Sequence, residues 1–132
     1  MPNHKYKNTG PRNIGLKHLI KYKFPVQAIA SILHRISGVI LFLFIPVILY
    51  TLDKSLNSSS CFNNVLAYFN HPVAKFFIWF FVSALIYHLL AGIKHVFMDI
   101  GLFEEKTSSQ VASYFVIILS TLLIILLGVW LW

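Results

Sequence analysis

The chain has 132 residues, of which 58% are hydrophobic and only 11% are charged, whereas a soluble domain has roughly 25% charged residues. This composition excludes both a water-soluble globule and a disordered chain, so it predicts a one-domain integral membrane protein. The formal net charge is +7, but most basic residues precede the first apolar stretch, which indicates membrane topology and no nucleic-acid partner.

The first 23 residues are polar and basic. They contain six lysines and arginines and no acidic residue. No apolar core of a signal peptide follows at the usual distance. Because cytoplasmic flanks of membrane spans carry an excess of Lys and Arg, we interpret 1–23 as a mature cytoplasmic segment.

Three apolar blocks follow this segment and form the predicted transmembrane domain, 24–132. A membrane span needs about 20 predominantly apolar residues, and each block provides them. The expected spans cover about 28–52, 73–95 and 110–132. The predicted fold class is an all-α membrane protein whose three transmembrane helices form part of a heteromeric helical bundle.

Two polar links, 53–72 and 94–110, separate these blocks. The first link is rich in Ser and Asn and is expected to be a loop. With the N-terminus in the cytoplasm, the first link lies outside, the second inside and the C-terminus outside. Trp130 and Trp132 would then form an interfacial anchor at that outer end.

Four polar or basic residues lie at the cytoplasmic start of the first span, namely Ser31, His34, Arg35 and Ser37. The first three share one helical face because they are three and four positions apart. A hydroxyl beside a guanidinium fits an acceptor-rich ligand such as a carboxylate, a phosphate or a quinone carbonyl. The residues equally fit a structural role, in which Arg35 reaches lipid headgroups and Ser31 bonds to its own helix.

His88 lies well inside the second span, where an ionisable side chain costs free energy and usually has a function. Neutral imidazole is the commonest metal ligand and an axial ligand of haem iron. Ala84 and Gly92 lie one turn to either side, so a flat macrocycle would fit close to the helix there. The alternative is a histidine that hydrogen-bonds across the bundle beside small packing residues.

Lys94, His95 and Asp99 follow at the cytoplasmic end of the second span. His95 is seven residues from His88, so both lie on one face about 10 Å apart along the axis. One haem iron cannot take both as ligands, and His95 would lie at the height of the propionates. Lys94 is expected to point about 100° away, toward headgroups or a partner subunit. The group also fits an ordinary solvated helix end.

Two polar motifs therefore occupy two different spans, SILHRISG over 31–38 and HLLAGIKHVFMDIG over 88–101. They resemble the two signatures of the cytochrome b556 membrane-anchor subunits of succinate dehydrogenase, the succinate:ubiquinone oxidoreductase called complex II. Phe24-Pro25 matches the run-in to the first signature, whereas Lys94 stands where the family usually has arginine. Three spans in the matching order extend the resemblance over much of the chain.

The resemblance implies a non-flavin subunit of an enzyme of the tricarboxylic acid cycle and electron transport, with no catalytic residue in this chain alone. The anchor would hold a flavoprotein and an iron–sulfur subunit on a bacterial cytoplasmic (inner) membrane. It would share one haem b with a second three-span anchor. His88 would be one axial ligand of the iron, and a histidine of the second anchor the other.

The resemblance also assigns the remaining site residues. His34, Arg35 and His95 would lie near the haem propionates, and Ser31 and Arg35 would line the ubiquinone site. FAD and iron–sulfur clusters would belong to the partner subunits. The single cysteine, Cys61, and the lack of a Gly-rich dinucleotide motif agree with that division.

Three alternatives differ from this interpretation. The first is an anchor of a fumarate reductase that works with menaquinol. The second is a non-haem membrane assembly subunit, in which His88 only holds helices together. The third is a small transporter with a relay of Arg35, His88 and Asp99, which is weakened because the chain has no inverted repeat.

Overall fold

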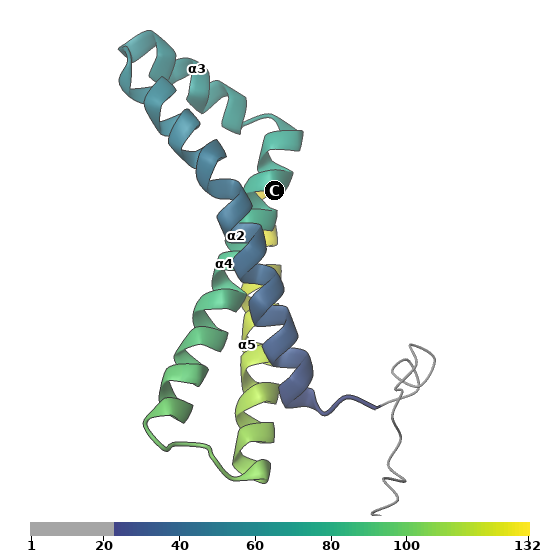
Figure 1. Ribbon diagram of the computed structural model, residues 1–132. Helices are drawn as coiled ribbons and strands as arrows, with labels where there is room; N and C mark the ends of the chain where they lie inside the picture. Colours follow the sequence, from purple (N-terminus) through teal and green to yellow (C-terminus); the bar gives the residue numbers. More distant parts are fainter. Residues whose placement is uncertain (1–22) are drawn as a thin grey trace, which may run out of the picture.

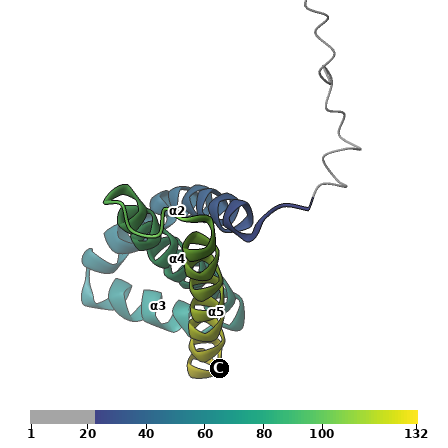
Figure 2. The same ribbon diagram turned by 90° about the horizontal axis from the view of Figure 1, so that it is seen from below.

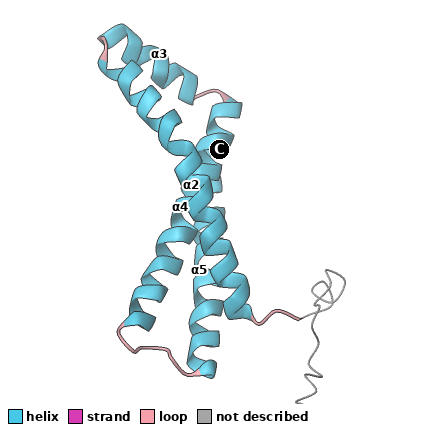
Figure 3. Ribbon diagram, viewed as in Figure 1, coloured by secondary structure: helices cyan, strands magenta, loops and turns pink. Residues whose placement is uncertain are grey.

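The computed structural model describes residues 23–132, so the predicted basic segment 1–23 lies, except for Lys23, outside the described residues. The described part is almost entirely helical and contains no strand. Its helices are α2 (Val26–Leu56), α3 (Ser59–Phe69), α4 (Pro72–Asp99) and α5 (Lys106–Leu131), as Figures 1 and 3 show. The predicted all-α class is confirmed.

Three of the helices, α2, α4 and α5, are long and apolar enough to cross a membrane. They contain 31, 28 and 26 residues. At about 1.5 Å per residue these lengths exceed the roughly 30 Å of a bilayer core, so the helix ends extend toward the headgroups. Large apolar side chains are exposed along all three helices, as expected for surfaces that contact lipid or other membrane helices.

The link over 53–72 is not the loop that its polar composition predicts. Most of it is helical, because α2 continues to Leu56 and α3 follows after two residues. The Ser58 side chain caps α3 by accepting a hydrogen bond of 3.1 Å from the Cys61 backbone N–H. Phe62, Leu66 and Phe69 recur at helical spacing and line a pocket against the end of α2. The capping serine and the apolar spacing together outweigh the polar content.

The three long helices pack through small side chains. α4 contacts both α2 and α5, and the view from below shows α4 beside both (Figure 2). The buried residues include Ala30 on α2, Ala91 on α4 and three serines on α5. Small residues let helix backbones approach closely, which supplies the packing that the hydrophobic effect does not provide within lipid.

Two cross-helix hydrogen bonds fix the ends of this packing. The Gln27 side chain donates to the Lys106 carbonyl at 3.1 Å, which joins the start of α2 to the start of α5. The Lys75 ammonium donates to the Leu131 carbonyl at 3.2 Å, which joins the start of α4 to the end of α5. The start of α2 and the α4–α5 link therefore lie at one end of the bundle (Figure 1).

Candidate functional site

Three histidines meet where α2 crosses α4. The His34 ring of α2 stacks on the His88 ring of α4, with centroids 4.2 Å apart and planes at 19°. The same His34 ring lies 5.1 Å from the ring of His95, which is two turns further along α4. His88 and His95 therefore share the face that their spacing predicts, and His34 contacts both.

The Nδ1 side of His88 is held entirely by α2. Nδ1 lies 3.1 Å from the Ser37 hydroxyl and 3.1 Å from the His34 carbonyl oxygen. The Ser37 hydroxyl donates to that same carbonyl at 2.7 Å, and its residue is only 4% exposed. Among the described residues no hydrogen bond reaches Nε2 of His88, so this nitrogen is available to a ligand.

Gly38 allows α2 to approach the His88 ring. A Cβ at this position would lie 3.1 Å from Cε1 of His88, which is tighter than nearly all real contacts. At Gly92, which the sequence favoured as the small neighbour of His88, a Cβ would meet His34 Nε2 at an ordinary 3.6 Å. The tight contact of the His88 ring is therefore with Gly38 of α2.

Sequence reasoning missed the roles of Ser37, Gly38 and Tyr87. The Tyr87 hydroxyl donates to the Ala30 carbonyl at 2.9 Å and so fixes α4 against α2 one residue before His88. A signal for the first two was present, because they lie three and four positions after His34 and so share its face. Which helix that face meets depends on packing, which spacing alone does not give.

His88 also lines an apolar groove with a volume of about 340 Å³. The remaining lining residues also come from α4, and they are Leu89, Gly92, Ile93, Val96 and Phe97. Leu89 and Val96 are about 60% exposed. Because a single helix lines it, the groove has one wall, and the site is incomplete within the described part of this chain.

Ser31 and Arg35 occupy the same α2 face by their spacing of four. Arg35 is exposed, and Ser31 is half-buried. Within residues 23–132 the structure gives neither side chain a hydrogen bond or an ion pair, so both retain free donors. Ser31 thus lacks the bond to its own helix that the structural interpretation supposed.

The predicted position of Lys94 is wrong. Its side chain is 6% exposed and lies against α5, where it lines a cavity of about 290 Å³ with Ala112, Phe115 and Val116. The angle of about 100° between successive helical residues does separate Lys94 from His95. However, small residues let α5 pack closely on α4, and α5 covers the face of α4 that carries Lys94. Asp99, one turn beyond His95, is exposed.

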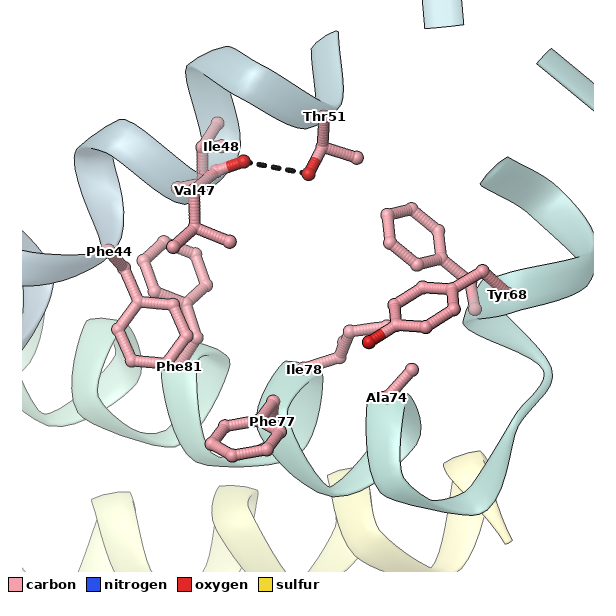
Figure 4. Close-up of a pocket in the computed structure, with 10 residues that line it drawn as sticks. Phe44, Val47, Ile48, Thr51, Tyr68, Ala74, Phe77, Ile78 and Phe81 are labelled. Carbon is pink, nitrogen blue, oxygen red and sulfur yellow. Dashed lines mark hydrogen bonds between the residues drawn. The ribbon is translucent and has the colours of Figure 1, made fainter. Parts of the chain in front are cut away.

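A second cavity of about 370 Å³ lies between α2, α3 and α4, toward the opposite end of the bundle (Figure 4). Aromatic and aliphatic side chains line it, including Phe44, Phe77 and Phe81. Thr51 is one of its few polar residues, and its hydroxyl donates to the Val47 carbonyl at 2.7 Å. None of the residues singled out from the sequence as candidate ligands lines this cavity.

Comparisons with known proteins agree with the resemblance. A family model described as succinate dehydrogenase/fumarate reductase transmembrane subunit matches residues 11–127. The succinate dehydrogenase cytochrome b556 subunit of Coxiella burnetii is 39% identical over 86% of this chain and 92% of its own length. The corresponding subunit of Rickettsia felis is 34% identical over 85% of this chain and 87% of its own length. That of Paracoccus denitrificans is 32% identical over 90% of this chain and 91% of its own length.

Proposed function

The chain belongs to the succinate dehydrogenase/fumarate reductase transmembrane subunit family, and from this membership we propose that it is a haem-binding, quinone-binding membrane anchor of succinate dehydrogenase. Family membership and three apolar helices make it a multi-pass membrane subunit. The observation that carries the proposal is the setting of His88. His88 lines an apolar groove, and within the described residues Nδ1 is the only nitrogen of its ring that is hydrogen-bonded.

The donor set around His88 fits a haem b, the group that the name cytochrome b of the relatives implies. An imidazole bonded at Nδ1 keeps the Nε2 lone pair for iron, and its partner fixes the ring orientation. The apolar α4 residues of the groove suit the face of a macrocycle. When bound, the haem supplies a centre that takes up and releases single electrons.

The one-sided groove supports a haem shared between two anchors. Within residues 23–132 only His88 combines a free ring nitrogen with a position on this groove. A second axial ligand and a second wall would come from another membrane chain. We propose that this chain is the second three-span anchor, with its own histidine on the iron.

His34, His95 and Arg35 are proposed to serve the haem propionates. A carboxylate in a medium of low dielectric is costly unless donors or cations accompany it. His34 contacts both other histidines, and His95 lies about 10 Å from His88 along the helix axis, toward the end of α4. His34 and His95 therefore lie close to His88, where the acidic substituents of a haem would need partners, and Arg35 follows His34 directly in the chain.

Ser31 and Arg35 are proposed to bind ubiquinone through its carbonyl oxygens. Both have donors that no described residue uses, and Arg35 lies about 14 Å along α2 from the start of the helix. Quinone reduction consumes two protons, so a site near the membrane surface with hydrogen-bond donors suits the reaction. The two side chains would orient the quinone and stabilise charge on its oxygens.

The same end of the bundle is the proposed docking face for the flavoprotein and iron–sulfur subunits. The basic residues of 1–23 favour a cytoplasmic N-terminus in a bacterial inner membrane. Succinate oxidation would occur at the FAD of the flavoprotein, and electrons would pass through iron–sulfur clusters to the quinone. The start of α2, with Ser31 and Arg35, lies at that end.

The test is the visible spectrum and haem content of the purified complex. We expect a reduced b-type α band, and we expect His88→Ala to lower haem content or change the spin state while the subunits remain assembled. His71→Asn is the matched control, because His71 caps the opposite end of α4 and Asn also caps helices. An unchanged haem spectrum in His88→Ala would remove this residue from the iron. A wild-type complex without the band would favour the non-haem assembly subunit.

A fumarate reductase anchor that uses menaquinol is the second candidate, since the matching family model covers both enzymes. The curated relatives described above are all named for succinate dehydrogenase, which favours the first candidate. Rates of succinate-dependent ubiquinone reduction and menaquinol-dependent fumarate reduction, measured on the same membranes, distinguish the two.

A further inference from the structure

The hydrogen bonds around the His88 ring constrain where its proton lies. The Ser37 hydroxyl has a single proton, and it donates that proton to the His34 carbonyl at 2.7 Å. Toward Nδ1 of His88, at 3.1 Å, the same oxygen can then act only as an acceptor. The His34 carbonyl, also 3.1 Å from Nδ1, is an acceptor too.

Two acceptors therefore face one ring nitrogen, and only a protonated Nδ1 satisfies both. The opposite tautomer would place the Nδ1 lone pair against a carbonyl oxygen, and Ser37 would have to give up its own bond to that carbonyl. Ser37 is buried, so no water replaces the lost partner at low cost.

We propose that Ser37 is a positioning residue for the iron ligand: together with the His34 carbonyl it holds His88 in the Nδ1–H tautomer, at a fixed ring angle, and so directs the Nε2 lone pair outward. This inference rests on the proposed function, because it concerns how the chain prepares His88 to ligate haem. It gives Ser37 a different role from Ser31 and Arg35, the possible ligand-binding residues with which it shares the start of the first span. Ser37 acts through His88 and contacts no ligand.

Loss of the hydroxyl should change the ligand without removing it. In Ser37→Ala, Nδ1–H keeps the His34 carbonyl but loses its second acceptor, so the imidazole becomes less basic and the reduced haem is favoured. A hydrogen bond of ordinary net strength limits the change in the equilibrium constant for haem reduction to at most about 2- to 12-fold. The freer ring should also shift or broaden the electron paramagnetic resonance signal of the oxidised low-spin haem.

The experiment compares Ser37→Ala, Ser37→Thr and Ser120→Ala in the purified complex, by haem content, redox titration and electron paramagnetic resonance. Threonine restores a hydroxyl. Ser120 is the matched control because it is 2% exposed and makes the same bond to the carbonyl three residues earlier, at 3.0 Å, with no histidine beside it.

A raised midpoint potential and an altered signal in Ser37→Ala, returned toward wild type by Ser37→Thr and absent in Ser120→Ala, support the proposal. Loss of haem in the alanine variant with retention in the threonine variant also supports it. Wild-type potential and signal in Ser37→Ala, or equal haem loss in both Ser37 variants, would overturn it. Failure of the proposed function itself looks different, since the wild-type complex would then contain no b-type haem.

Discussion

Replacement of Gly38 by alanine tests the contact between α2 and the His88 ring most directly. The added Cβ would lie 3.1 Å from Cε1 and 3.6 Å from Nδ1 of His88, whereas ordinary contacts begin at 3.4 Å. The ring must therefore retreat by about 0.3 Å, which lengthens the bonds of 3.1 Å from Nδ1 to Ser37 and His34. Hydrogen bonds weaken beyond roughly 3.2 Å, and a lengthening of this size would take both bonds past that distance.

The expected effect is on the ligand and not on assembly. Weakening one such bond costs about 0.5–1.5 kcal/mol, or roughly a 2- to 12-fold loss of haem affinity. Alanine also improves the helix by about 0.5–1 kcal/mol over glycine, which offsets the strain in the folded chain. We therefore expect Gly38→Ala to assemble normally but to contain less haem after purification, with a shifted low-spin signal.

Gly128 provides a matched control at another aromatic contact. A Cβ there would lie 3.2 Å from the indole nitrogen of Trp79, almost as tight as the contact at Gly38. That nitrogen donates to the Ile124 carbonyl at 3.2 Å and links α4 to α5. Gly128→Ala should likewise assemble normally, because the same helix gain offsets the strain, and should leave the haem spectrum unchanged. The reasoning fails if Gly38→Ala has wild-type haem content and signal, or if the two variants change the haem equally.

Two further predictions address the remaining site residues. Ser31→Ala and Arg35→Leu should lower the rate of ubiquinone reduction about 5- to 150-fold, the equivalent of roughly 1–3 kcal/mol. Electron transfer from succinate to a soluble dye should be retained in both variants. An equal loss in both assays would indicate defective assembly. His95→Leu should shift the haem midpoint potential, whereas Lys94→Met should leave it unchanged. Lys94→Met should also leave the melting temperature of the complex equal or higher, because Lys94 is buried with no ion pair among the described residues. A fall in melting temperature would show instead that another chain supplies an anion to Lys94.

The parts of the fold that depend on one helix at a time could be predicted from the sequence. The lengths of the apolar blocks predict α2, α4 and α5, and the spacing of seven places His88 and His95 on one face. The sequence does not predict helix α3, because the Ser and Asn residues of this link are typical of a loop. One of them, Ser58, caps the helix, and Phe62, Leu66 and Phe69 supply its apolar face.

The parts that depend on how helices pack could not be predicted in this way. A helical angle separates Lys94 from His95 but does not say that α5 covers Lys94. Likewise, the face shared by His34 and Ser37 is apparent from spacing, whereas its contact with His88 requires the crossing of α2 over α4. These crossings depend on small buried residues such as Ala30 and Ala91, whose role is apparent only once the helices are in place.

The contacts at Nδ1 of His88 are complete within this chain, whereas the groove that His88 lines needs another chain to cover it. Every contact on the Nδ1 side comes from α2 of this chain, through Ser37, Gly38 and the His34 carbonyl. The groove that His88 lines has only an α4 wall, with Leu89 and Ile93 exposed. The orientation of the proposed ligand is therefore set within this chain, before a second anchor binds. It follows that changes at Ser37 or Gly38 alter the ligand itself, whereas changes at Leu89 or Ile93 alter the surface that a second anchor would cover.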